Sequence, residues 1–287
     1  MDQRIIRLYD EYTHAPLERR VFLKRLSELA GGTAAAAALL PLLENNYAKA
    51  AIVAPDDARL ETGYVTYKGA TGDLRAYVAK QKNGPAKRPA IVIIHENRGL
   101  HPHIEDVVRR TALEGFTAFG PDLLSPQGGT PADEDAARDL FSKIDRGVAV
   151  QNLLATVAYV RARPDVTDKI GCIGFCWGGG MGNLLVVNSP DLVAAVQYYG
   201  QVPNPADVPK IRARLLLHYA GLDERINAGI PGYEAALKGA NVAYTMYMYE
   251  GVNHAFNNDV GGARYDKPAA ELAWNRTITF LKENLAD

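Results

Sequence analysis

The feature that most constrains the fold is a cysteine framed by glycines at the end of an apolar run. Residues 169–183 read KIGCIGFCWGGGMGN, so a β-branched stretch stops at Cys176 and breaks at once into glycines. Such a run predicts a buried strand, and the glycines mark a sharp change of backbone direction. The spacing Gly174-x-Cys176-x-Gly178 is the pattern of a nucleophile elbow, in which a strained strand-to-helix turn lifts one side chain above the sheet.

A thiol at such a turn is well placed for chemistry. The helix that should begin after Trp177 directs backbone N–H groups at the side chain, which favours a thiolate and can hold a developing oxyanion. A free cysteine is more commonly a small buried hydrophobe, and Cys172, which lacks the glycine frame, fits that description. We therefore predict that Cys176 is a nucleophile and that Cys172 is structural.

The segments around the elbow predict an α/β fold. Residues 63–69 and 74–81 alternate between polar and apolar residues and flank a turn, so they predict an opening antiparallel hairpin. Further on, short apolar strands alternate with helices, which favours a mostly parallel sheet with helices on both faces. The strands are expected within 90–100, 116–124, 169–175, 192–200, 213–223 and 243–256. The helices are expected near 104–113, after Trp177, and near 147–163, 231–238 and 267–285, with a polar loop before residue 146.

Composition narrows the class of protein. The 287 residues, 47% of them hydrophobic, are enough to bury one large core, and a formal net charge of −1 with interspersed charges predicts no nucleic acid partner. The two cysteines lie in one predicted strand and turn, so they should not form a disulfide.

The first 55 residues differ from the catalytic domain expected over residues 56–287. Arg19 and Arg20 precede a weakly hydrophobic Ala/Leu stretch, and the small-x-small sequence Ala48-Lys49-Ala50 suits a signal peptidase. This pattern predicts a twin-arginine export signal and a periplasmic protein. The apolar part, residues 34–43, is far shorter than the roughly 20 residues of a membrane-spanning helix, so we expect no stable membrane anchor.

The alternative for this segment is a helical arm retained in a cytoplasmic protein. Upstream of the arginine pair, apolar residues recur at helical spacing, which predicts an amphipathic helix: Ile5, Leu8, Tyr9 and Tyr12. Such an arm could pack on the body or on a second copy, which makes it a candidate surface for a homodimer.

An elbow needs a histidine and an acid, and both follow it in the chain. Asp223 and His254 end or follow predicted strands, and the order nucleophile, acid, histidine is that of an α/β-hydrolase triad. Asp122 also ends a strand but precedes the elbow, so it is the second choice for the acid. The other histidines are weaker candidates: His14 lies in the arm, His218 inside a strand, and the pair His101 and His103 lacks a second cluster that would indicate a metal site.

The elbow GFCWGG together with HENRGL at 95–100 resembles the dienelactone hydrolase family, also called carboxymethylenebutenolidases, from about residue 60 to the C-terminus. The resemblance implies an α/β-hydrolase fold without metal or organic cofactor. It implies that Cys176 is the nucleophile, that His254 is the general base and acid, and that Asp223 orients it. The backbone N–H groups of Trp177 and Asn97 would form the oxyanion hole.

The resemblance also implies that Glu96 contacts the resting thiol. A carboxylate there would penalise the thiolate and protect the sulfur from oxidation until substrate displaces it. The structural alternative is a salt bridge from Glu96 to Arg98 or Arg225.

Substrate recognition departs from the family pattern. Members that cleave dienelactone hold its carboxylate with arginines, but Pro126 and Asn258 stand at the positions expected here, so dienelactone itself is a doubtful substrate. Other cations and aromatic side chains are candidates for binding substrate: Arg98, Arg225, Arg264, Trp177, Tyr199 and Tyr265.

The sequence thus predicts a hydrolase of a small-molecule carboxylic ester or lactone that uses a Cys-His-Asp triad. Two alternatives stay open: a non-catalytic relative whose thiol senses oxidants or a ligand, and thioesterase or dehalogenase chemistry at the same triad.

Overall fold

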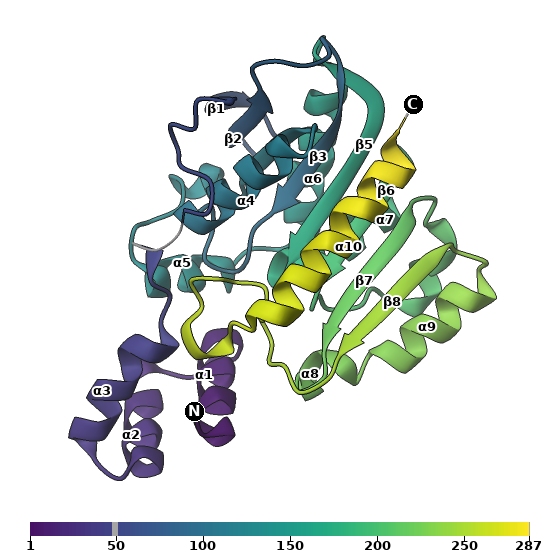
Figure 1. The fold of residues 1–287 in the computed structure, drawn as a ribbon. Helices are drawn as coiled ribbons and strands as arrows, with labels where there is room; N and C mark the ends of the chain where they lie inside the picture. The colour runs from purple at the N-terminus through teal and green to yellow at the C-terminus, as the bar shows by residue number, and fades with distance from the viewer. Residues whose placement is uncertain (48–50, 287) are drawn as a thin grey trace.

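One eight-stranded sheet organises the molecule in the computed structural model, which describes residues 1–47 and 51–286 (Figure 1). The strand order is β1-β2-β4-β3-β5-β6-β7-β8. The strands β1 and β2 form the expected antiparallel hairpin, β2 also runs antiparallel to β4, and all the other pairs are parallel. Their bounds are β1 Leu60–Lys68, β2 Asp73–Gln81, β3 Arg88–Ile94, β4 Thr117–Asp122, β5 Val166–Phe175, β6 Leu192–Tyr198, β7 Arg214–Ala220 and β8 Tyr244–Tyr249.

Helices cover both faces of this sheet, which explains the continuous apolar runs of its central strands. Two buried clusters lie on opposite faces of the sheet. One includes side chains of α5, α6, α7 and α9, and the other includes side chains of α4 and α10. The bounds are α4 Pro102–Leu113, α5 Glu134–Phe141, α6 Arg146–Arg161, α7 Trp177–Asn188, α8 Glu224–Asn227, α9 Ile230–Gly239 and α10 Lys267–Leu285, with short 3₁₀ turns η2 Ser125–Gln127, η3 Pro205–Lys210 and η4 Gly262–Arg264. The predicted α/β fold is confirmed.

The stretch before residue 146 contains α5, where the sequence predicts only a polar loop. Asp133 caps this helix by accepting a hydrogen bond from Ala136 N (2.7 Å), and Ala137 and Phe141 are buried against the sheet. With only two buried positions in eight residues, its periodicity is too short to stand out from the loop that surrounds it.

The N-terminal arm, defined here as residues 1–47, forms three helices below the body in the view of Figure 1. They are α1 Gln3–His14, α2 Arg19–Ala30 and α3 Thr33–Leu43, and they share a small core of their own. The apolar residues that predict an amphipathic helix are all buried along α1. Ala48-Lys49-Ala50, the expected cleavage site, lies outside the described residues.

The arm contacts the body through polar groups. Tyr12 Oη donates to Asp135 at the start of α5 (2.7 Å), and Arg7 pairs with Glu224 of α8 (3.0 Å). Asn46 N donates to Val260 O (3.0 Å) beyond the last strand. The end of α1 therefore lies against the loops at the carboxyl edge of the sheet.

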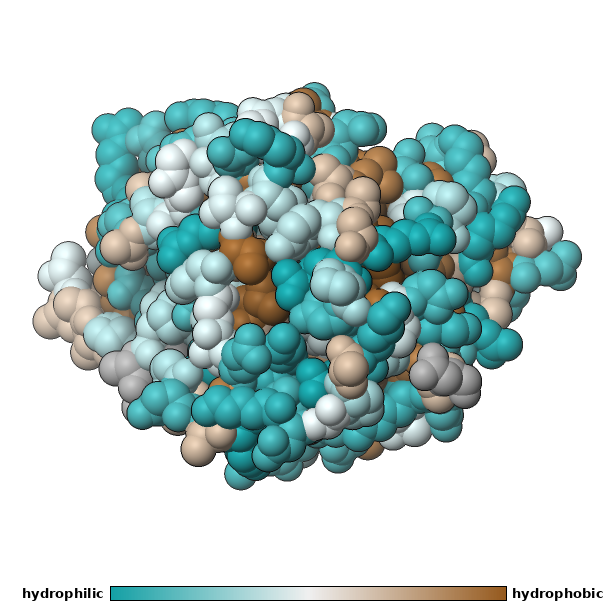
Figure 2. All heavy atoms as spheres, turned by 90° about the horizontal axis from the view of Figure 1, so that it is seen from above, coloured by the Kyte–Doolittle hydropathy of each residue, from teal (hydrophilic) through white to brown (hydrophobic). Residues whose placement is uncertain are grey.

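Within the described ranges 1–47 and 51–286, no single helix has the length and apolar composition to cross a membrane. The pair α2 and α3 meets the criterion only jointly, and the two helices are bent by 111° to one another. The face seen in Figure 2 is mostly hydrophilic, and its hydrophobic side chains lie in hollows between polar ones.

Candidate active site

Cys176 stands at the strained turn that its sequence frame predicts. Its backbone has φ 54° and ψ −116°, a conformation that a non-glycine residue rarely adopts, between the end of β5 and the start of α7. A Cβ at Gly174 would lie 2.2 Å from Gly178 O, and one at Gly178 would lie 2.3 Å from Ile94 O. The two glycines are therefore required by close backbone approaches on both sides of the thiol.

A buried carboxylate and imidazole lie beside this turn, as predicted. Asp223 Oδ2 and His254 Nδ1 are 2.5 Å apart, and both side chains are at least 97% buried. Asp223 follows β7 and caps α8, where its Oδ1 accepts from Ile226 N (3.2 Å), so its orientation is fixed from two sides. Because Asp223 holds Nδ1, the Nε2 atom of His254 is the free nitrogen of the ring, and it has no hydrogen-bond partner.

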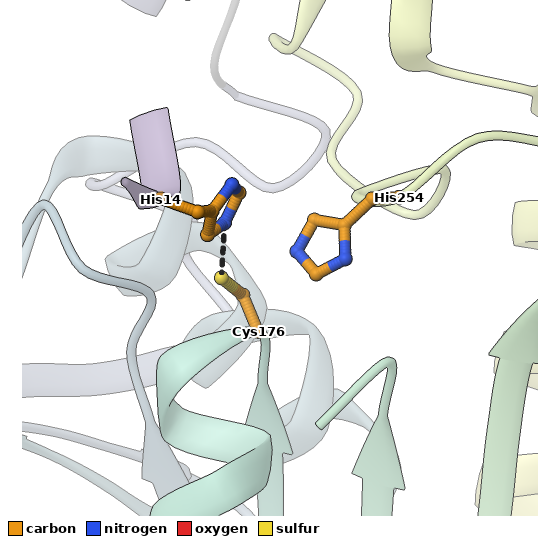
Figure 3. Close-up of side chains that lie close together, drawn as sticks. All are labelled: His14, Cys176 and His254. Carbon is orange, nitrogen blue, oxygen red and sulfur yellow. Dashed lines mark hydrogen bonds between the residues drawn. The ribbon is translucent and has the colours of Figure 1, made fainter. Parts of the chain in front are cut away.

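The arm brings a second histidine to the thiol. His14, at the last position of α1, places Nε2 3.1 Å from Cys176 Sγ (Figure 3). Its Nδ1 lies 3.1 Å from Asp10 Oδ1 and 2.9 Å from the Asp10 carbonyl oxygen. The rings of His14 and His254 meet edge to face, with centroids 4.6 Å apart. Two histidine–carboxylate pairs, from opposite ends of the chain, thus flank one sulfur.

The thiol, the two imidazoles and their carboxylates shift one another's pKa values. Burial opposes ionisation of the thiol. The positive charges of His14 and His254, together with the hydrogen bond between His14 Nε2 and Sγ, outweigh this effect and lower the pKa of Cys176. Burial also acts to lower the pKa of both histidines. The negative charges around them outweigh burial and raise both pKa values: Asp223 and Cys176 act on His254, and Cys176 and Asp10 act on His14. Each of these groups therefore favours the charged form of its neighbours, and a thiolate is the reactive form of cysteine.

Glu96 follows β3 and lies in a second, small cavity with Cys176, but its hydrogen bond is to another residue. Its Oε2 accepts from Asn258 Nδ2 (2.8 Å), whereas its Oε1 is buried without a partner. The expected Glu96–thiol contact is thus not a hydrogen bond in this structure, because His14 occupies the position beside the sulfur. Asn258, which stands where an arginine was expected, holds the carboxylate instead.

The remaining predicted residues divide between the site and its surroundings. Asn97 lies beside the elbow, where its side chain donates to Thr13 O in the arm (2.8 Å). Trp177 begins α7, so its backbone N–H is one of the amides that a helix start leaves without an intrahelical acceptor. Tyr199 has an unusual φ of 38° and a buried hydroxyl without a partner. All three line the large cavity described below.

The arginines predicted as salt-bridge partners of Glu96 pair with other carboxylates. Arg98 is buried and lies 3.6 Å from Asp135 Oδ1 and 3.8 Å from Glu134 Oε2, and Arg225 approaches Asp10 Oδ2 (3.8 Å). Arg225 lines the large cavity and Arg98 only the small one. Tyr265 lines none of the described cavities, so the structure does not bring it to the site. Arg264 is buried and stacks over Tyr9 of α1 (4.9 Å).

Asp122, the second choice for the acid, serves the loop after β4. Its carboxylate accepts from Leu124 N (3.0 Å) and from the backbone and hydroxyl of Thr130 (both 2.8 Å). These bonds fix the loop, so Asp122 does not orient His254.

A cavity of about 930 Å³ opens over Cys176. The arm forms one wall with residues 13–19, and α5, the start of α6, Trp177 and Tyr199 form much of the rest. Cys176, His14 and His254 all face it, so a small organic molecule can reach the thiol. His14 is the functional candidate that sequence reasoning set aside, since no local pattern signals that the end of α1 reaches the elbow.

Comparisons with known proteins agree on one family. The family model "Dienelactone hydrolase family" matches residues 74–285, a range that leaves the arm outside. A protein of Escherichia coli (strain K12), provisionally named a carboxymethylenebutenolidase, is 31% identical over 245 residues, which are 80% of this chain and 89% of the relative. A similarly named protein of Saccharolobus solfataricus is 30% identical, over 76% of this chain and 97% of its own.

Solved structures give the same result. The crystal structure of a protein from Klebsiella pneumoniae subsp. pneumoniae MGH 78578, provisionally described as a dienelactone hydrolase, matches with a TM-score of 0.72 and 27% identity. The match covers 78% of this chain and 99% of the other.

Proposed function

Because this chain belongs to the dienelactone hydrolase family and is a hydrolase, we propose that it cleaves a carboxylic ester or lactone with Cys176 as the nucleophile. The observation that carries the proposal is the thiol on the strained turn, flanked by the free Nε2 of His254, whose Nδ1 is held by Asp223. Nucleophile, base and orienting acid are the three parts that covalent acyl transfer requires.

The first half of the reaction forms an acyl-enzyme. The thiolate of Cys176 attacks the carbonyl carbon, and the oxyanion that forms is held by the backbone N–H groups of Trp177 and Asn97. His254, protonated at Nε2, gives that proton to the leaving alkoxide as the C–O bond breaks. In a lactone the alcohol stays attached to the acyl group.

The second half regenerates the thiolate. His254 takes a proton from water, the hydroxide adds to the thioester carbonyl, and the C–S bond breaks to release the acid. Asp223 keeps Nε2 directed at the sulfur throughout. For Glu96 we propose a role beside the thiol in the state in which His14 has moved away, since its Oε1 has no partner in this structure.

The cations of the large cavity suggest which substrates fit. Arg19, Arg138 and Arg225 each have a carboxylate neighbour within the arm or α5, whereas Arg146 has none among the residues described. Arg146 is an exposed residue, and desolvation that no partner among the described residues offsets lowers its pKa. We propose that it attracts an anionic group on the substrate, so Arg146→Ala should raise KM for an acidic ester and leave a neutral one unchanged.

The test is steady-state hydrolysis of p-nitrophenyl acetate and a panel of small lactones by wild type, Cys176→Ala and His254→Ala, with stopped-flow detection of a burst. Multiple turnovers that both substitutions abolish support the proposal. A single modification without turnover would favour a thiol sensor, and turnover only of thioesters or haloacids would favour the other chemistries of this triad.

Localisation is a separate proposal. We propose that Arg19 and Arg20, followed by the weakly apolar α3, direct export through the twin-arginine route. The contacts of α1 with the active site support the alternative of a retained arm in the cytoplasm. The mass of the native protein distinguishes the two, because cleavage near residue 50 would remove His14.

A further inference from the structure

We propose that His14, Cys176 and His254 form a binding site for a soft divalent metal ion of the zinc type. The arm supplies one ligand and the catalytic domain two, so the site belongs to the chain that retains its arm. The inference goes beyond the proposed hydrolysis, because a metal bound to Sγ would withdraw negative charge from the sulfur and obstruct its approach to the substrate carbonyl. The site would therefore hold the enzyme in a closed, reversible resting form.

The donor atoms lie at nearly the required spacing. One nitrogen of each ring and the sulfur lie within 4.8 Å of one another, and His14 Nε2 is already 3.1 Å from Sγ. A tetrahedral ion, with bonds of about 2.3 Å to sulfur and about 2.0 Å to nitrogen, holds its ligands about 3.3–3.5 Å apart. The widest of the three separations, at most 4.8 Å, is the one that must shorten when an ion binds. Within residues 1–47 and 51–286, no other group of three such side chains meets this criterion.

Each histidine is oriented as metal-bound histidines usually are. A carboxylate on one ring nitrogen fixes the tautomer and presents the other nitrogen to the ion. Asp223 does this for His254 (2.5 Å). For His14 the hydrogen bond at Nδ1 is to the Asp10 carbonyl oxygen (2.9 Å), and the Asp10 carboxylate lies 3.1 Å away. Both rings turn toward the sulfur from different elements of the chain (Figure 3).

A second observation points to a ligand at this position. The Nε2 atom of His254 is buried, faces the cluster and has no hydrogen-bond partner. A buried polar atom without a partner costs free energy, and coordination to a metal removes that cost. The donor set of one thiolate and two imidazoles favours zinc or copper over magnesium or calcium.

The cavity over Cys176 gives the ion a way in and leaves a fourth position for water. On binding, Sγ coordinates as a thiolate, both Nε2 atoms coordinate as neutral imidazoles, and the protons they held pass to solvent. Because α1 carries one of the ligands, the ion also fastens the arm to the body.

The experiment uses the full chain, treated with EDTA, dialysed and kept anaerobic, and titrated with Co²⁺ without substrate. We expect one Co²⁺ per chain with a thiolate-to-cobalt charge-transfer band and the visible bands of tetrahedral cobalt, displaced by Zn²⁺. Cys176→Ser should abolish the charge-transfer band. His14→Gln should weaken binding at least 100-fold, and Asp10→Asn by about 10- to 100-fold.

The control is His101→Ala, which removes a histidine outside the cluster and should leave the cobalt spectrum unchanged. Circular dichroism establishes that each variant folds. A wild type without the charge-transfer band, or equal binding by wild type and His14→Gln, would overturn the site.

Hydrolysis measured separately distinguishes this inference from the proposed function. Turnover in EDTA that Zn²⁺ inhibits in wild type, and inhibits at least 100-fold less potently in His14→Gln, supports the site. Turnover in EDTA without the cobalt band leaves the hydrolase standing and rejects the metal. Turnover lost in EDTA and restored by Zn²⁺ would overturn the blocking role, because the ion would then be needed for catalysis.

Discussion

Two histidine–carboxylate pairs flank Cys176, and they come from different parts of the molecule. The pair His254–Asp223 lies on loops that follow β8 and β7, and both side chains are almost completely buried. The pair His14–Asp10 lies on the last turn of α1, where the side chains are 11% and 22% exposed. The first pair is built into the sheet, whereas the second reaches the sulfur only because the arm docks.

This difference separates their expected roles. The first pair is attached to β7, β8 and α8, which are parts of the sheet and its cover, so its position does not depend on the arm. It therefore suits a step that must occur in each turnover. The second depends on a docked helix, and its removal would open the cavity. We therefore expect the first pair to carry the chemistry and the second to set the resting state of the thiol.

Replacement of the buried imidazole should have the largest effect. His254→Ala removes the group that protonates the alkoxide and activates water, so kcat/KM for p-nitrophenyl acetate should fall by about 10²- to 10⁴-fold. His14→Ala should lose much less. Equal losses in the two variants would show that the pairs share the acid–base role and would break the distinction.

The two carboxylates provide a matched comparison. Asp223→Asn should lower kcat by on the order of 10²-fold or more, since the amide no longer holds Nδ1 as a carboxylate does. Asp10→Asn, the same change in the other pair, should lower kcat by less than about 10-fold. Steady-state kinetics on both variants measures the ratio, and a larger loss in Asp10→Asn would reverse the assignment.

The pKa of the Cys176 thiol should depend directly on His14 of the arm. The positive charge of His14 lowers the pKa of Cys176, so His14→Ala should raise that pKa and reduce the thiolate fraction at neutral pH. Iodoacetamide alkylation measured against pH gives the midpoint. If the pKa of Cys176 rises by one unit, the thiolate fraction at pH values below the midpoint falls about tenfold. An unchanged midpoint would mean that His254 alone sets the charge of the thiol.

The smallest effect tests how firmly the arm docks. Tyr12→Phe removes the hydroxyl that donates to Asp135 (2.7 Å), which should cost about 1 kcal/mol. Urea unfolding followed by circular dichroism measures the change against Tyr64→Phe, where the lost contact lies on the exposed β1 edge. A loss in Tyr12→Phe no larger than in the control would indicate that this hydrogen bond does not hold α1 and that its other contacts with the body do.

Much of the site could be predicted because the sequence features that mark it are short local patterns, or residues that follow one another along the chain in a fixed order. The glycines around Cys176 are required because a Cβ at Gly174 or Gly178 would lie only 2.2 or 2.3 Å from a backbone oxygen, and this requirement leaves a recognisable pattern in the sequence. Asp223 and His254 follow strands that the apolar runs reveal, and parallel strands bring their carboxyl ends to one edge. The helix α5 was missed because eight residues with two buried positions carry too weak a periodicity.

The sequence by itself determined the parallel sheet, the elbow at Cys176 and the order of acid and histidine, because close backbone packing and strand periodicity act over a few residues. Only the tertiary structure decided that His14 lies against the sulfur and that Glu96 bonds to Asn258. Each of these contacts joins residues 162 positions apart in the chain. Their partners are selected by how the arm and the loops pack on the finished sheet, and no local pattern encodes that packing.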